Sequence, residues 1–335
     1  MGGLNTKEFN LPVSDLPSGD YIIKWNVSDR TEGNIPLTIL PVIKYEYEKS
    51  ALGKLKNKTN EGGYNTLMFM LQDVMNNYKS VKPYETASFI RKSFQTYKSC
   101  VTGLESGTDS LKLKRGTFRR AFISGIDKTL QPYSVKVPEN YNSSNKYPLF
   151  VMLHGSGSDD TEMLTGTALT ENNFIEIAPN GRGTSNCFTV DSAQADNKEA
   201  IEDAIKNYSI DTSRIIIAGF SMGGYGAYRT YFEHPGMFRA VAVFSGHPNL
   251  PSKWFAEGFP DFLNDEYLKP FKGIPVFIYH SKNDLNCPYE LTQQLVSKLA
   301  KAGAKVKFVV SDESGHGIIN NENIPVYYQW LKSVY

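Results

Sequence analysis

A serine between two glycines is the clearest chemical signal in the chain. The segment Gly219-Phe220-Ser221-Met222-Gly223 follows an apolar run at residues 214–218 and precedes a helical pattern that begins near Met222. The G-x-S-x-G pattern alone is weak because glycine and serine are common, but a strand–turn–helix context is typical of a nucleophilic serine. Side chains at positions 219 and 223 would be expected to collide with the neighbouring strand and helix. We therefore predict that Ser221 is a catalytic nucleophile.

A serine hydroxyl needs a base at neutral pH, and elimination among five histidines favours one of them. His316 lies between Gly315 and Gly317, after the last predicted strand, and the glycines would let this loop fold over the sheet edge. In the chain order serine, acid, histidine, it is the best-placed candidate for the general base. The other histidines are His154, His234, His247 and His280.

The matching acid is expected between Ser221 and His316. Asp284 is the preferred candidate because it comes just after an apolar run at residues 275–279, which should end at the same sheet edge as the serine turn. It would accept the Nδ1–H of His316 and stabilise the imidazolium. Asp312 is the second choice, although it is very close in sequence to His316. The remaining candidates are Glu233, Glu257, Asp261, Asp265, Glu266, Glu290 and Glu313.

Acyl transfer from such a serine also needs donors for the developing oxyanion. One expected donor is the backbone N–H of Met222, the residue after the nucleophile. The second is expected from the glycine-rich loop His154-Gly155-Ser156-Gly157, which follows the apolar run at residues 149–153. We predict the N–H of Ser156 as this donor.

The elements that must position these residues form an alternating series. From about residue 116, short apolar runs alternate with helical patterns, which predicts an α/β fold with an open, mostly parallel sheet. Ligands in such sheets bind at the carboxyl ends of the strands. The predicted strands are 121–124, 133–137, 149–153, 174–178, 214–218, 240–244, 275–279 and 306–310, and the helices are 197–207, 222–232, 289–302 and 324–334.

The N-terminal third differs in pattern from the rest. Tyr21, Ile23, Trp25 and Val27 alternate with other residues at the period of a half-buried strand, and a second strand is expected at residues 35–42. Helical periodicity follows at residues 66–78 and 84–104. We therefore predict a β-rich segment at 1–45, a helical segment at 46–115 and the α/β domain at 116–335.

Composition excludes several classes of protein. The 335 residues include 36 basic and 35 acidic side chains, a net charge of +1, which gives no bulk attraction to nucleic acid or an anionic membrane. No apolar run approaches the roughly 18 residues that a membrane span requires. Three cysteines without a C-x-x-C pattern indicate no zinc site; one disulfide or three free thiols both stay open. No signal peptide is visible, and no metal or cofactor is predicted.

These motifs together resemble a known family. Leu153-His154-Gly155-Ser156-Gly157, Ala178-Pro179-Asn180-Gly181, Asp211-Thr212-Ser213-Arg214-Ile215 and the Ser221 segment are similar to those of α/β-hydrolase esterases. The most similar group is the feruloyl and acetyl-xylan esterases and polyhydroxybutyrate-depolymerase-like enzymes. The resemblance covers residues 116–335 and includes Asp284 and the His316 loop. It implies a serine carboxylesterase that removes feruloyl or acetyl groups from plant polysaccharide through an acyl-enzyme on Ser221, with no cofactor. It also implies an extracellular location.

Substrate contacts are expected from His154 and from two long loops. The segment 248–273 carries Trp254, and the segment 180–191 carries Arg182. The aromatic residues of the first loop could equally close the core. Two alternative functions stay open, a prolyl-oligopeptidase-like serine peptidase and a non-catalytic carbohydrate-binding homologue. The N-terminal segment is too short for the propeller that would accompany the first and shows no blade repeat.

Overall fold

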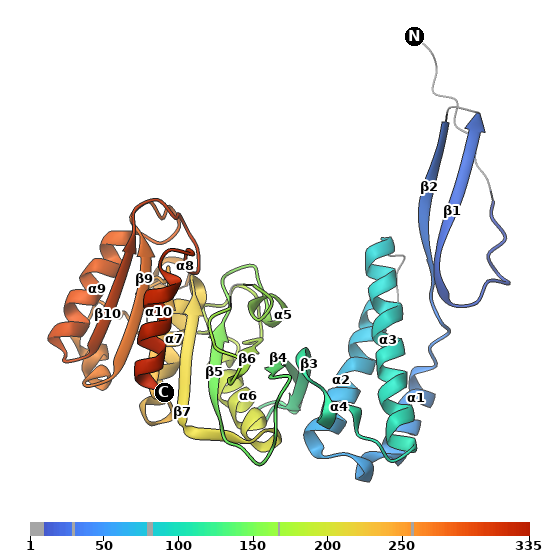
Figure 1. Ribbon diagram of the computed structural model, residues 1–335, viewed down its shortest axis with the longest axis horizontal. Coiled ribbons are helices and arrows are strands. Elements are labelled where there is room, and N and C mark those ends of the chain that lie inside the picture. Colours follow the sequence, from blue (N-terminus) through green and yellow to red (C-terminus); the bar gives the residue numbers. More distant parts are fainter. Residues whose placement is uncertain (1–9, 29–30, 79–82, 167, 256–257) are drawn as a thin grey trace. The chain divides into compact units, whose positions relative to one another are not determined.

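The computed structural model describes residues 10–28, 31–78, 83–166, 168–255 and 258–335. The chain divides into two compact units, Met1–Leu111 and Lys112–Tyr335 (Figure 1). The predicted segments 1–45 and 46–115 fall almost entirely in the first unit.

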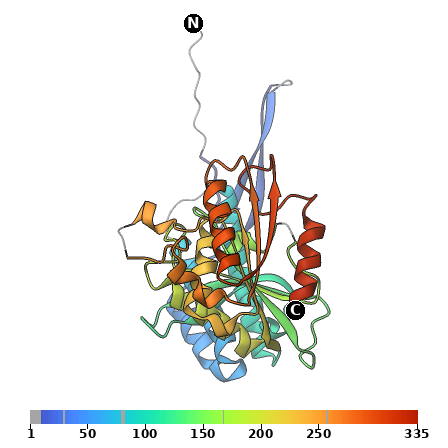
Figure 2. The same cartoon turned by 90° about the vertical axis from the view of Figure 1, so that its left-hand side faces the viewer.

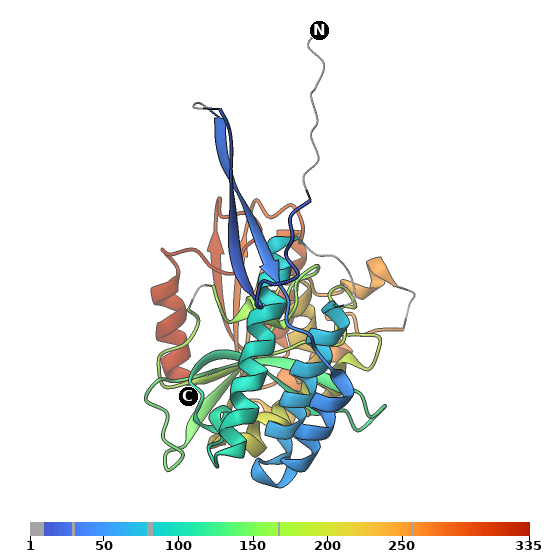
Figure 3. The ribbon, with the colours of Figure 1, turned by 90° about the vertical axis from the view of Figure 1, so that its right-hand side faces the viewer.

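The N-terminal unit combines a two-stranded ribbon with helices. Strand β1 (Gly19–Ser28) pairs antiparallel with β2 (Thr31–Ile39), and β2 contacts helix α3 (Figure 3). Asp20 of β1 forms an ion pair with Arg91 of α3 at 2.5 Å. The helical elements are α1 (Tyr45–Lys54), η1 (Lys56–Lys58), α2 (Glu61–Tyr78), α3 (Tyr84–Glu105) and, at the boundary, α4 (Ser110–Leu113).

Helix packing, and not the ribbon, forms the core of this unit. Leu52, Leu67, Leu71, Ile90 and Tyr97 are among its buried residues. The two predicted helices are confirmed, since α2 and α3 include residues 66–78 and 84–104. The prediction that this strand is half-buried is wrong at its C-terminal end, because Val27 is 79% exposed. A two-stranded ribbon has no second layer that could cover both of its faces.

Among the described residues, the second unit is built on an eight-stranded sheet with the order β10-β9-β8-β7-β5-β6-β4-β3. Strand β4 pairs antiparallel with β3 and β6, and the remaining pairs are parallel. The predicted α/β fold is therefore confirmed. The strands are β3 (Gly116–Ile123), β4 (Leu130–Val137), β5 (Tyr147–Leu153), β6 (Ile175–Pro179), β7 (Ile210–Phe220), β8 (Ala240–Phe244), β9 (Pro275–Ser281) and β10 (Lys305–Ser311).

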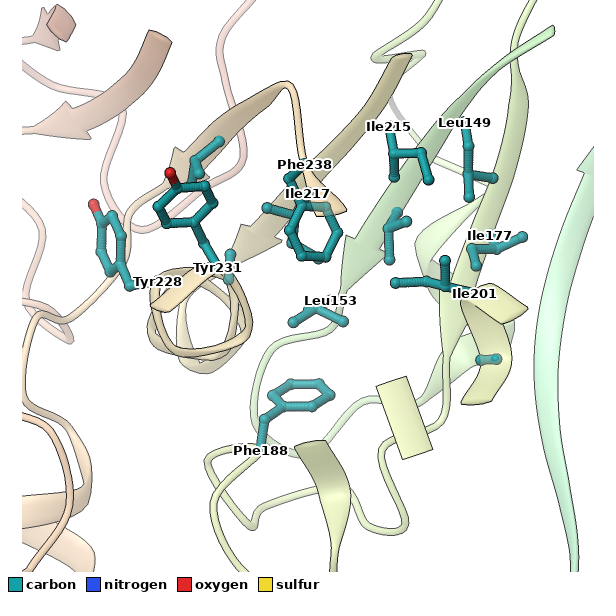
Figure 4. Packing of buried hydrophobic residues seen from close by; sticks show 14 of the residues in the cluster. Leu149, Leu153, Ile177, Phe188, Ile201, Ile215, Ile217, Tyr228, Tyr231 and Phe238 are labelled. Carbon is teal, nitrogen blue, oxygen red and sulfur yellow. The ribbon is translucent and has the colours of Figure 1, made fainter. Parts of the chain in front are cut away.

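Two apolar layers cover the sheet. Alternate residues of β5 belong to different layers. Leu149 and Leu153 belong to one layer (Figure 4), together with Val151. Phe150 and Met152 belong to the other. Helices α6, α7 and α9 pack into the first layer and α10 into the second, so that α9 and α10 lie on either side of β10 (Figure 2). Burial on both faces explains why these strands read as continuous apolar runs. The helical elements are α5 (Asp160–Met163), α6 (Ala193–Asn207), α7 (Met222–Glu233), η2 (Pro235–Met237), α8 (Pro251–Trp254), η3 (Asp265–Phe271), α9 (Tyr289–Lys301) and α10 (Ile324–Val334).

Two further observations concern membrane-spanning helices and disulfide bonds. A search of the described residues for a helix with the length and apolarity of a membrane span returned no candidate. Cys100, Cys187 and Cys287 are buried free thiols, so the disulfide alternative is not realised in this structure.

Candidate active site

Ser221 lies on a sharp turn between β7 and α7. Its backbone has φ 55° and ψ −117°, a left-handed conformation that costs a non-glycine residue on the order of 1–3 kcal/mol. Its N–H donates to the carbonyl of Phe244 on the neighbouring strand β8 at 3.0 Å. This strained turn directs the residue to the carboxyl edge of the sheet.

Two glycines make the turn possible. A Cβ atom at Gly219 would lie 1.9 Å from the carbonyl oxygen of Gly223, and one at Gly223 would lie 2.1 Å from the carbonyl oxygen of Leu153. Both contacts are with backbone atoms that cannot rotate away. The collisions expected from the sequence are therefore confirmed.

The structure brings the predicted serine, histidine and acid together. His316, in the loop after β10, has Nε2 2.9 Å from Ser221 Oγ and Nδ1 2.8 Å from Asp284 Oδ2. Asp312, the second choice for the acid, is instead exposed and forms an ion pair with Lys282 at 2.7 Å. Glu257, another candidate, lies outside the described residues.

The carboxyl group of Asp284 is buried and held by several donors. Oδ1 accepts hydrogen bonds from the N–H groups of Asn286 and Cys287, both at 2.9 Å. Burial by itself raises the pKa of Asp284, but hydrogen bonds from His280, His316 and these backbone groups outweigh it and hold the pKa well below its ordinary value. Asp284 is therefore a carboxylate at neutral pH and favours the His316 tautomer that carries its proton on Nδ1.

A cavity of about 390 Å³ opens beside Ser221. Ser156 and Trp254 lie on its wall. Met222 has a buried side chain; as the first residue of α7 it has a backbone N–H with no carbonyl one turn earlier in the helix to accept it. The described lining residues are Gly155, Ser156, Phe220, Ser221, Leu250, Lys253, Trp254, Asn286, Cys287 and His316. A nucleophile, a base and a helix N-terminus thus meet at one concave surface.

Comparison with known proteins places the chain in a family. The model of the prolyl oligopeptidase family matches residues 163–333. The chain belongs to the prolyl oligopeptidase family. The predicted resemblance to α/β-hydrolase esterases is confirmed by its relatives.

These relatives are of two kinds. A probable feruloyl esterase C of Aspergillus terreus is 33% identical over 126 residues, which are 34% of this chain and 46% of that protein. A probable dipeptidyl-peptidase 5 of the same species is 25% identical over 236 residues, which are 58% of this chain and 32% of that protein. The chain thus spans half or less of the length of these relatives. The crystal structure of a thermostable esterase superposes with a TM-score of 0.51 at 25% identity, covering 65% of this chain and 62% of that one.

His280 is a neighbour of the acid that the sequence analysis did not select. It is fully buried at the end of β9, and Nε2 lies 2.8 Å from the carbonyl oxygen of Cys287 and 3.4 Å from Asp284 Oδ2. Thr292 Oγ1 lies 2.9 Å from its Nδ1. His280 therefore holds the loop that carries the acid. The available signal was its position four residues before Asp284.

The loop of His316 is attached to its neighbours on both sides of the histidine. The N–H of Gly315 donates to Asn283 Oδ1 at 2.7 Å, and Ser245 Oγ donates to the carbonyl of Gly317 at 2.8 Å. The ring of Phe220 lies 4.9 Å from the His316 ring. These contacts position the imidazole before substrate binds.

The substrate contacts predicted for His154 and Arg182 do not fit the structure. His154 is fully buried, with Nδ1 2.9 Å from the carbonyl oxygen of Gly155 and Nε2 3.0 Å from that of Asn180. Arg182 forms ion pairs with Asp127 at 2.6 Å and Asp196 at 3.6 Å, and neither residue is among those lining the described cavity. Both follow the ends of buried strands, but carbonyl groups hold the His154 ring and carboxylates hold the Arg182 guanidinium, so neither side chain lines the described cavity.

His154 nevertheless has a structural relation to the site. Because its ring contacts the carbonyl of Gly155, it fixes one side of the Gly155–Ser156 peptide, and the N–H of Ser156 lies on the opposite side of the same planar group. Ser156 Oγ is held in turn by Ser185 Oγ at 2.8 Å. The described residues contain no group of three or more His, Cys, Asp or Glu side chains that could hold a metal ion.

Proposed function

We propose that this protein is a serine hydrolase, a carboxylesterase that acts through an acyl-enzyme on Ser221. The observation that carries the proposal is the 2.9 Å separation between Ser221 Oγ and His316 Nε2, with Asp284 2.8 Å behind the ring. This geometry supports proton transfer from the hydroxyl to the imidazole.

The proposed reaction has two steps. Ser221 Oγ attacks the ester carbonyl carbon while its proton passes to His316 Nε2, and the imidazolium then protonates the departing alcohol oxygen, leaving Ser221 acylated. A water molecule then attacks the acyl carbon and gives one proton to His316 Nε2. The bond from the acyl carbon to Ser221 Oγ breaks, the imidazolium returns the proton to Oγ, and the carboxylic acid leaves. Asp284 stabilises the imidazolium in both steps.

The oxyanion formed in each step needs donors. We assign the backbone N–H groups of Met222 and Ser156 to this role. The first is at the N-terminus of α7, and the second belongs to a loop held by His154 and Ser185. Donors of this type contribute roughly 2.7–4 kcal/mol each to transition-state stabilisation.

The finer substrate class proposed is a feruloyl or acetyl ester on plant polysaccharide. The relative named feruloyl esterase C supports it, and so does Trp254, whose side chain is 44% exposed on the cavity wall and can stack on a sugar or an aromatic ring. A polymer of this kind lies outside cells, so the proposal includes an extracellular location.

A peptidase is the second candidate, favoured by the family itself and by the dipeptidyl-peptidase relative. An enzyme that removes dipeptides must bind a positively charged substrate amine. The described cavity lining includes a lysine and neither Asp nor Glu, which disfavours such a substrate and supports the esterase.

A substrate panel tests the proposal. The protein is assayed with 4-nitrophenyl acetate, methyl ferulate, acetylated xylan and dipeptide nitroanilides. We expect ester cleavage, a fall in kcat of roughly 10⁴–10⁶-fold in Ser221→Ala, and unchanged activity in the exposed control Ser143→Ala. Cleavage of the nitroanilides alone would establish the peptidase. Binding of xylan without any hydrolysis would establish a non-catalytic role.

A further inference from the structure

We propose that Lys253 makes this site selective for esters that carry a carboxylate close to the ester group. The inference rests on the proposed function, because it concerns the substrate that Ser221 would acylate from. It begins with the charges of the side chains that line the cavity.

Lys253 carries the one permanent charge on the described cavity wall. Of the ten lining residues, none is an acid, and the only other titratable groups are His316 and Cys287. Asp284 lies behind His316, and its oxygens are already engaged by hydrogen bonds. Burial raises the pKa of the Cys287 thiol to about 12, so this thiol is neutral. Among the described residues that line the cavity, the only permanent charge beside Ser221 is therefore positive.

The charge of Lys253 is not neutralised within the described part of the protein. Other exposed lysines pair with acids, such as Lys282 with Asp312 and Lys298 with Asp265, both at 2.7 Å. No described carboxylate is in ion-pair contact with Lys253. The carboxylate of Asp261, which acts on His247 together with Lys253, is itself engaged: Oδ2 accepts from Asn249 and Oδ1 accepts from the N–H of Leu263. Among the described residues, no carboxylate competes with a ligand for this ammonium group.

The positive charge of Lys253 affects the pKa values of two buried groups, His247 and Cys287. Burial lowers the pKa of His247 to about 4, and Lys253 adds to this effect. Lys253 also acts on Cys287, where it opposes the rise caused by burial. A substrate carboxylate between the cavity mouth and Ser221 would lie within the same field.

The surroundings of Lys253 indicate the rest of the ligand. Lys253 and Trp254 are adjacent residues at the end of α8, and both line the cavity together with Leu250. The N–H of Lys253 donates to the carbonyl of Leu250 at 3.0 Å, which fixes this short turn. A cation next to an exposed indole suits a ring bearing a carboxylate. The carboxylate could belong to the alcohol, as in an acidic sugar, or to the acyl group, as in a dicarboxylic half-ester.

Two matched ester pairs separate these sources. On the alcohol side, 4-acetoxybenzoate is compared with its methyl ester. On the acyl side, mono-4-nitrophenyl adipate is compared with methyl 4-nitrophenyl adipate. The measured quantity is the ratio of kcat/KM for the anionic ester to that for the neutral ester, with the whole 335-residue chain at low and high salt.

We expect Lys253→Met to lower this ratio about 3- to 10-fold for at least one pair, and Lys253→Glu to lower it further. The effect should shrink at high salt, because the charge is exposed and screened. The control is Lys305→Met, at the end of β10 that lies away from the His316 loop. It should leave the ratio of kcat/KM values unchanged. The pair that responds identifies the side of the ester that carries the charge. The proposal would be overturned if kcat/KM fell equally for both esters of each pair, or if the ratio were unchanged in both variants.

A binding measurement keeps this test separate from the proposed function. If the wild-type protein cleaves no ester, the esterase proposal fails. Calorimetry with the non-hydrolysable 4-acetamidobenzoate and its methyl ester still tests Lys253. Tighter binding of the acid that is lost in Lys253→Met supports the charge preference, and equal binding of acid and methyl ester refutes it.

Discussion

The two walls around Ser221 differ in how firmly they are held. On one side, His316, Asp284, His280 and the Ser156 loop are buried or held by hydrogen bonds of 2.7–2.9 Å to backbone and side chains. On the other side, α8 is a single turn whose Lys253 and Trp254 are exposed. The first wall suits bond making and breaking, which needs fixed geometry, and the second suits recognition of variable substrates. Variants on the two walls should therefore affect different kinetic constants.

The largest effect after loss of the nucleophile is expected for Asp284→Asn. The amide keeps the shape of the carboxylate but favours the wrong His316 tautomer, so kcat should fall roughly 10⁴-fold. The measurement is the hydrolysis rate of 4-nitrophenyl acetate, with Asp312→Asn as the matched control, which should behave as wild type. Loss of activity in the control and not in Asp284→Asn would identify Asp312 as the acid.

A smaller effect on the same wall is expected for His154→Leu. Loss of both ring nitrogens frees the Gly155–Ser156 peptide, so kcat should fall about 10- to 100-fold while KM changes little. The melting temperature should also fall, since a buried carbonyl group loses the ring N–H that donates to it. His234→Leu, at the end of α7, is the control. A folded His154→Leu protein with a raised KM and normal kcat would restore the substrate contact inferred from the sequence.

A pH-dependent effect on stability is expected from Asp196, next to the loop that supports the Ser156 segment. Burial raises the pKa of Asp196 to about 7, against the opposing influence of the Gly181 N–H and Arg182. Between its ordinary pKa and pH 7 the folded state keeps a proton that the unfolded state releases, so the free energy of unfolding decreases as pH rises through this range. The full effect is roughly 2–4 kcal/mol.

Asp196→Asn should remove this dependence. Its amide oxygen can still accept from Gly181, and it carries no charge at any pH. The melting temperature is measured at pH 5 and pH 8, and it should fall more between these pH values in the wild type than in the variant. An equal fall in melting temperature would mean that Asp196 is charged in the folded protein across this range.

The smallest effect is expected on the exposed wall, for Trp254→Ala. Loss of one stacking surface should raise KM for methyl ferulate about 3- to 10-fold, with kcat nearly unchanged and the melting temperature within about 1 °C. Phe89→Ala, an exposed aromatic residue of the N-terminal unit, is the control. A large drop in kcat would show that α8 shapes the reacting geometry and would remove the contrast between the two walls.

Much of the fold could be predicted from local patterns. The sheet strands are short apolar runs, and the glycines around Ser221 mark a turn that only they permit, so both signals lie within a few neighbouring residues. The strand at β1 also followed from its alternation, but its burial did not, since the Val27 side chain is 79% exposed. Period predicts which residues share a face, and only packing determines whether that face is covered.

The functional side chains were predictable to different degrees. His316 and Asp284 follow strand ends in the expected chain order, and their side chains reach the serine. His154 also follows a strand end, yet its ring is fully buried between two carbonyl groups. Position in the chain places a residue at the sheet edge but does not specify whether the side chain points toward the cavity or the core.

The amino-acid sequence by itself determined the strands, the helices and the strained serine turn, because these depend on the sizes and shapes of adjacent residues. Only the tertiary structure decided which imidazole reaches Ser221. The hydrogen bond joins residues 95 positions apart, and it depends on the order of β7, β8, β9 and β10 across the sheet. That order brings distant loops to one edge, where burial and hydrogen bonding select a single geometry for the serine, the histidine and the acid.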